Sequence, residues 1–205
     1  MVLVDTGMTN PADASQFAIR GFRPAAAALK TAGVDPADIT DIVLTHSHVD
    51  HAGSIALFPT ARLYLQRSEL AYFEKTERYE RFRETIEEYR ATNRLMILDG
   101  DYRMTPWLKI IAAGGHTAGS QAVQIDSEGR SVLITGDNCY FASACRKGIV
   151  LPDIAAQDPE RNRAFVSFAR QFSGKIVTLH DPAIVDEQGA GPGIYRVQYL
   201  SLIHI

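Results

Sequence analysis

The chain of 205 residues lacks most features of secreted, disulfide-built or membrane-spanning proteins. Its two cysteines, Cys139 and Cys145, are too few for a disulfide framework and form no Cys-x-x-Cys pair. We interpret both as packed thiols in a reducing compartment and therefore expect a cytoplasmic protein. No apolar run reaches membrane-spanning length, and the first residues do not resemble a signal peptide.

An excess of positive charge is also missing. The chain has 21 basic and 24 acidic residues, a formal net charge of -3, and no basic stripe or Lys-rich tail. This balance makes nucleic acid a weak candidate for a partner. Hydrophobic residues make up 46% and charged residues 22%, which excludes disordered and fibrous classes and predicts one domain with a sizeable core.

Against this ordinary background, three of the six histidines lie within one short segment. His46, His48, Asp50 and His51 follow an apolar run, 42–44, that is typical of a buried strand. Imidazole nitrogen and carboxylate oxygen suit zinc and its first-row neighbours, and a short loop after a strand can turn several such groups toward one point. The segment therefore predicts a metal site.

Three further candidate ligands also follow apolar runs. His116 lies among small residues that let the backbone turn tightly, Asp137 comes just past a predicted strand, and His180 follows another. With the first cluster they make five histidines and two aspartates, more than the three or four ligands of one zinc. The set predicts two metals that share one aspartate, and a closed structural zinc site fits it poorly.

The periodicity of the chain predicts a layered α/β domain whose loops build one site. A charged stretch, 77–90, has apolar residues at helical spacing and is expected to form an amphipathic helix. Other helices are expected at 25–32 and 159–172. Short strands are expected at 42–44, 62–65, 95–98, 108–112, 122–125, 132–135 and 176–179.

The order His-x-His-x-Asp-His, Gly-His-Thr, Gly-Asp and a last His resembles the metallo-β-lactamase superfamily. The resemblance implies a four-layer αββα sandwich with a dinuclear site at one sheet edge. It also implies which residues bind metal: His46, His48 and His116 one ion, Asp50, His51 and His180 the other, and Asp137 both. Asp5 matches a family position that supports the metal loops without binding metal.

Within the superfamily, the segments 66–69, 99–102 and 116–121 are similar to the N-acyl homoserine lactonase group. Tyr140 lies three residues beyond Asp137, as a tyrosine does in those lactonases. The resemblance implies two divalent metals, with zinc expected and iron, manganese or cobalt compatible. It further implies attack on a lactone carbonyl by a bridging hydroxide, with Tyr140 steadying the oxyanion and Asp50 acting as general acid.

Other interpretations of the sequence stay open. A glyoxalase II-like thioesterase shares the ligand set and the spacing from Asp137 to Arg146. A phosphodiesterase or nuclease is disfavoured by the acidic balance, and a non-catalytic fragment is the remaining alternative. We expect a natural chain to begin before Met1, residues 200–205 to be an adapter-derived tail, and 1–199 to form a single hydrolase domain. Nothing in the sequence indicates the oligomeric state.

Overall fold

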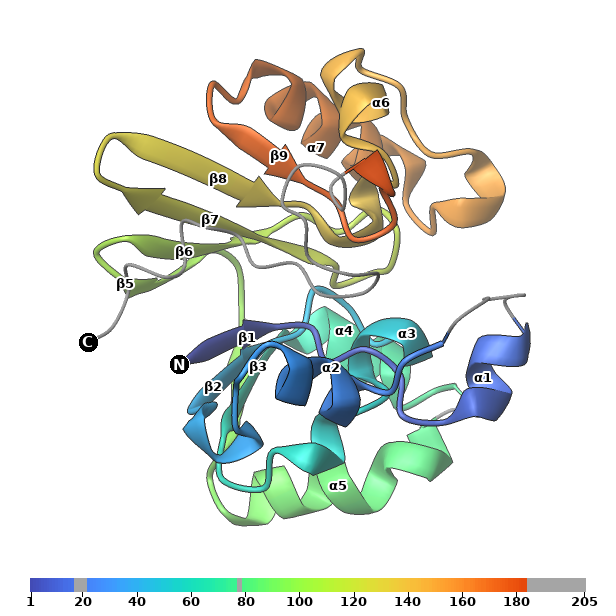
Figure 1. Cartoon of the computed structure of the whole chain (residues 1–205). Coiled ribbons are helices and arrows are strands. Elements are labelled where there is room, and N and C mark those ends of the chain that lie inside the picture. Colours follow the sequence, from blue (N-terminus) through green and yellow to red (C-terminus); the bar gives the residue numbers. More distant parts are fainter. Residues whose placement is uncertain (17–21, 77–78, 184–205) are drawn as a thin grey trace. The chain divides into compact units, whose positions relative to one another are not determined.

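The structure of the protein is a computed structural model, and it describes residues 1–16, 22–76 and 79–183 (Figure 1). The described residues form two compact units, the first holding 1–64 and 79–96 and the second 65–76 and 97–183. Each unit is built mainly around one sheet, so the expected mixture of strands and helices is present. A single domain over 1–199 stays a prediction, and residues 200–205 lie outside the described residues.

The sheet of the first unit has four strands in the order β1-β2-β3-β4. They are β1 (Val2–Val4), β2 (Asp41–Val43), β3 (Arg62–Gln66) and β4 (Leu95–Leu98). β2 is parallel to both β1 and β3, and Val4 is paired with Val43. Because parallel strands end at the same edge of a sheet, the residues after β1 and β2 lie side by side. Asp5 N accordingly donates to Val43 O at 3.0 Å.

The longest helix of the first unit is the amphipathic one that the sequence predicts. It buries Phe82, Ile86 and Tyr89, and the Tyr89 hydroxyl donates to the carbonyls of Ile55 (3.2 Å) and Phe58 (2.7 Å). Burial raises the pKa of Tyr89 to about 12. The helices and 3₁₀ turns of this unit are α1 (Pro11–Gln16), α2 (Ala25–Thr31), η1 (Pro36–Asp38), α3 (Val49–Ala52), η2 (Ile55–Leu57) and α5 (Tyr79–Ala91).

The sheet of the second unit has five strands in the order β5-β6-β7-β8-β9. They are β5 (Tyr102–Thr105), β6 (Leu108–Ala112), β7 (Gln121–Ser127), β8 (Arg130–Ile134) and β9 (Lys175–Val177). Neighbours are antiparallel except β8 and β9, which are parallel. A hairpin joins β7 and β8, with Glu128 and Gly129 at positive φ in its turn.

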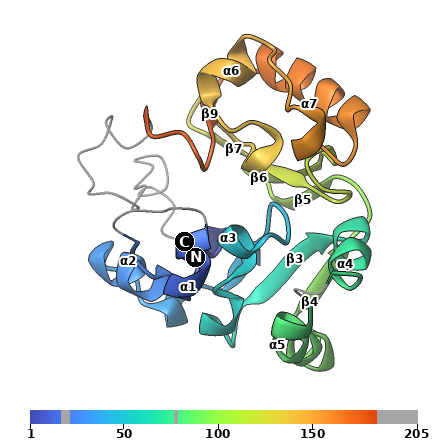
Figure 2. The ribbon, with the colours of Figure 1, turned by 90° about the vertical axis from the view of Figure 1, so that its right-hand side faces the viewer.

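Two helices cover one face of this second sheet, as both views show (Figures 1 and 2). These are α6 (Ala142–Arg146) and α7 (Pro159–Gln171); α4 (Arg67–Phe73) and the 3₁₀ turns η3 (Gly136–Asn138) and η4 (Asp153–Ala155) complete the unit. Asp158 caps α7 by accepting from Arg161 N at 3.0 Å, as its Asp-Pro start predicts. No helix in the described part of the chain is long and apolar enough to cross a membrane.

The interpretation of the cysteines as free thiols is wrong. Cys139 and Cys145 form a disulfide with a Cα–Cα distance of 5.7 Å. They are packed, as expected, in a core between α6, α7 and the second sheet. The bond could not be predicted from the sequence, because it depends on a turn at the start of α6. In that turn Cys145 N donates to Phe141 O at 3.0 Å. That turn brings two cysteines six residues apart together.

Candidate metal centre

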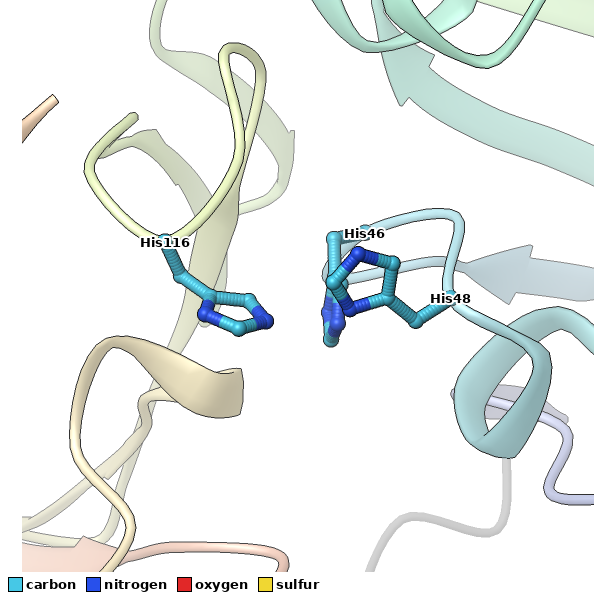
Figure 3. A group of neighbouring side chains, drawn as sticks. All are labelled: His46, His48 and His116. Carbon is cyan, nitrogen blue, oxygen red and sulfur yellow. The ribbon is translucent and has the colours of Figure 1, made fainter. Parts of the chain in front are cut away.

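The first group of candidate ligands follows β2, where the buried strand ends. His46 is fully buried, and its ring centroid lies 4.6 Å from that of His48 and 4.0 Å from that of His51. Asp50 and His51 fall in α3, with a distance of 3.4 Å between Asp50 Oδ2 and His51 Nε2. Figure 3 shows His46 and His48 beside each other on the loop after β2. The four residues predicted from this segment are therefore brought together.

Asp5 holds this segment through three hydrogen bonds. Its carboxylate accepts from Thr45 N at 2.6 Å, from Thr45 Oγ1 at 2.7 Å and from His51 Nδ1 at 2.8 Å. Asp5 has φ +56°, in the left-handed region that aspartate tolerates better than most residues. The support for the histidine loop that the family resemblance implies for Asp5 is therefore present.

The same bonds determine which ring nitrogen carries the proton in His46 and in His51. Because a carboxylate only accepts, His51 Nδ1 must donate to Asp5, which leaves the lone pair on Nε2. Thr45 Oγ1 gives its proton to Asp5 and can therefore accept from His46 Nδ1 at 3.1 Å. Neutral imidazoles whose Nδ1 is bonded in this way present Nε2 to a metal ion. The donor set of this loop thus fits a divalent metal.

His116 lies in the second unit, on the loop after β6 (Figure 3). It is 7% exposed, and its Nδ1 donates to the carbonyl of Ala155, in η4, at 2.7 Å. Its Nε2 is therefore the nitrogen with the lone pair. Gly114 and Gly115 precede it with φ +64° and +96°, so the loop needs glycine to make this turn.

Asp137 connects the two histidines of the second unit. One of its carboxylate oxygens, Oδ2, lies 3.6 Å from His116 Nε2 and 3.2 Å from His180 Nε2. The Asp137 side chain is 5% exposed and that of His180 is 40% exposed. This buried carboxylate oxygen therefore lies close to both imidazole nitrogens.

Tyr140 lies against the same two histidines. Its ring centroid is 6.1 Å from that of His116 and 5.6 Å from that of His180, and both contacts are edge to face. These contacts place the aromatic ring beside the candidate ligands of the second unit. Arg146, whose spacing from Asp137 is shared with the thioesterase alternative, donates to the backbone carbonyls of Phe172 and Gly174.

Glu69 is a residue of this centre that sequence reasoning missed. It is 1% exposed, and its carboxylate accepts from Thr117 Oγ1 at 2.6 Å and from Gly119 N at 3.0 Å. A Cβ on Gly119 would lie 2.2 Å from Glu69 N, so only glycine fits there. Glu69 falls in the segment 66–69 that resembles the lactonases, but no pattern in the sequence indicates its contact with the loop of His116.

The chain is similar to a known protein family and to several known proteins. The family described as the metallo-beta-lactamase superfamily matches residues 1–145. An N-acyl homoserine lactonase of Bacillus thuringiensis is 34% identical over 113 residues, which cover 55% of this chain and 43% of that protein. The N-acyl homoserine lactonase AttM of Azorhizobium caulinodans is 26% identical over 191 residues, 82% of this chain and 68% of that protein.

A solved structure of a related enzyme is similar to this chain in fold. It is an N-acyl homoserine lactone hydrolase with the product N-hexanoyl-L-homoserine bound at its catalytic metal centre. It is 25% identical with a TM-score of 0.70, over 92% of this chain and 79% of that chain. The likeness to this structure confirms the expected fold type. The part of the chain that matches the Bacillus relative spans less than half of that protein's length.

Proposed function

The chain belongs to the metallo-β-lactamase superfamily, and from this premise we propose that it is a metal-dependent hydrolase that opens a lactone ring. The substrate we propose is an N-acyl homoserine lactone or a closely related small molecule. The observation that carries this choice is the contact of Tyr140 with both His116 and His180. The relatives named as N-acyl homoserine lactonases support it.

We propose that the chain binds two divalent metal ions, with zinc as the natural choice for nitrogen and oxygen donors. The ligands proposed for one ion are His46, His48 and His116, for the other Asp50, His51 and His180, and for both Asp137. Two sets of residues have the composition of metal sites, which supports the proposal: His46, His48 and His116, and Asp50, His51, Asp137 and His180. So do the Nδ1 hydrogen bonds of His46, His51 and His116, which direct Nε2 toward a ligand.

When bound, such metals supply a nucleophile at neutral pH and polarise the oxygen of a carbonyl. Side chains of the protein stabilise the developing charge and transfer the proton. The hydroxyl of Tyr140 donates to the substrate oxygen on which negative charge develops, and so stabilises the transition state. Asp50, whose side chain is 21% exposed, takes up the proton that the nucleophile loses after it has attacked the carbonyl, and passes it to the alkoxide that leaves as the ring opens.

Turnover of a panel of acyl homoserine lactones by the full chain, with and without a chelator, tests the proposal. We expect hydrolysis that the chelator abolishes and added zinc restores. A glutathione thioester in the same panel tests the thioesterase alternative. Faster hydrolysis of the thioester than of every lactone would replace the lactonase assignment by that of a glyoxalase II-like enzyme.

The remaining parts of the proposal concern partners and compartment. We propose no nucleic-acid partner and no membrane association, in line with the net charge of -3, and we assign no oligomeric state. We propose the cytoplasm as the compartment, although the disulfide of Cys139 and Cys145 weighs against it, since cytoplasmic thiols are kept reduced. Free thiols at both positions in protein taken from its own cells would support the cytoplasm, and a disulfide there would contradict it.

A further inference from the structure

Asn162 is a fully buried amide near the start of α7. Its side chain is 0% exposed, while both neighbours in the sequence, Arg161 and Arg163, are exposed. A buried amide costs free energy unless its oxygen and its nitrogen both find partners, so such a residue in a helix has a specific role in its surroundings.

The amide of Asn162 bonds to two separate segments of the second unit. Its Nδ2 donates to the backbone carbonyl of Asn138 at 3.0 Å and to Asn138 Oδ1 at 3.1 Å. Its Oδ1 accepts from Leu151 N at 2.9 Å. Asn138 directly follows Asp137, and Leu151 begins the stretch that leads to η4. Both polar atoms of the Asn162 amide are therefore used.

Asn138 extends this connection to the loop of His116. Its Oδ1 also accepts from His116 N at 3.1 Å, so one buried oxygen holds α7 and the histidine loop together. The packing is close, because a Cβ on Gly115 would lie 2.5 Å from Asn138 Oδ1 and 2.9 Å from Asn162 Cα. The segments that carry Asp137 and His116 are therefore packed closely against Asn162.

The bond to Leu151 reaches His116 by a second route. The segment that starts at Leu151 ends in η4, where the carbonyl of Ala155 accepts from His116 Nδ1 at 2.7 Å. Asn162 therefore restrains the backbone of His116 on one side and the acceptor of its ring on the other. Both restraints act on the direction in which His116 Nε2 points.

We propose that Asn162 is a positioning residue of the metal centre, which sets His116 and Asp137 at the separation that metal binding requires. It acts through Asn138 and Leu151 and touches neither substrate nor metal. This inference rests on the metal site of the proposed function and does not depend on the identity of the substrate.

Asn162→Asp tests the inference with almost no change in size. The new carboxylate still accepts from Leu151 N. It cannot donate to the two oxygens of Asn138, however, and places a negatively charged oxygen against them. We expect zinc affinity of the full chain, measured by competition with a chromophoric chelator, to fall by about 10-fold to 100-fold. The absorption spectrum of the cobalt-loaded protein should change as well, because it reports ligand geometry. Asn162→Ser, which is milder, should shift both readouts in the same direction.

Val166→Ala is the matched control, because Val166 is a buried residue of the same helix that packs in the core. It should lower the thermal stability of the apoprotein and leave zinc affinity and the cobalt spectrum unchanged. The inference is overturned if the Asn162 variants keep both metal readouts, or if Val166→Ala alters them equally for the same loss of stability. Failure of the wild-type chain to bind zinc would instead overturn the metal site of the proposed function, and this inference with it.

Discussion

Replacing Asp5 by asparagine separates the shape of this side chain from its charge. Asparagine tolerates the left-handed backbone at φ +56°, so the variant introduces no new strain. The carboxylate accepts at one oxygen from Thr45 N and at the other from Thr45 Oγ1 and His51 Nδ1. The amide of asparagine offers one acceptor and one donor, so it cannot satisfy both sides.

Each orientation of the new amide carries a cost that can be estimated. If the amide nitrogen faces Thr45 N, two donors meet and the free energy of unfolding falls by about 1–3 kcal/mol. If it faces His51 Nδ1, the proton of His51 moves to Nε2, the atom proposed to bind metal. Loss of such a supporting partner lowers metal affinity by about 10-fold to 100-fold, which equals roughly 1.4–2.7 kcal/mol.

The assay pairs urea unfolding of the apoprotein with zinc competition against a chelator. Asp38→Asn is the control, because Asp38 is an exposed aspartate in η1 of the same unit. It should match the wild-type protein in both measurements. If Asp5→Asn also matched the wild type in unfolding free energy and zinc affinity, the reasoning about the support of His51 would be refuted.

Three further predictions follow from single contacts. Tyr140→Phe should keep both metals and lower lactone turnover by about 10-fold to 100-fold, and unchanged turnover would remove Tyr140 from the mechanism. Joint replacement of Cys139 and Cys145 by serine should lower the free energy of unfolding by about 2 kcal/mol, as expected for so short a disulfide loop, and an unchanged urea midpoint would contradict this. Burial would raise the pKa of Asp41, but hydrogen bonds, chiefly from Arg62, outweigh it and leave the pKa below its usual value. The stability that this lowered pKa gives is present at neutral pH and is lost as pH falls through it, so Arg62→Ala should move acid unfolding to higher pH.

The metal loop was readable from the sequence because its residues are neighbours along the chain. His46 to His51 follow a buried strand, and residues so close along the chain stay close in space whatever the rest of the fold does. The amphipathic helix α5 was predictable for the same local reason, because its apolar residues repeat at helical spacing. Short elements such as β5 and α6 carry too few residues for a periodic signal.

The residues that hold the ligands in place could not be predicted in this way. Asn162 is 24 residues from Asn138, and Glu69 is 48 residues from Thr117. An asparagine or a glutamate at the start of a helix looks like an ordinary exposed polar residue until its distant partner is known. The pairing of Cys139 with Cys145 likewise depends on how the start of α6 turns the chain.

Zinc titration of the apoprotein, with lactone hydrolysis followed at each addition, tests the central claim most directly. We expect no hydrolysis by the apoprotein and a rise to a plateau at about two equivalents of zinc per chain. Lactone hydrolysis by the metal-free chain, or zinc binding that leaves every lactone intact, would contradict it.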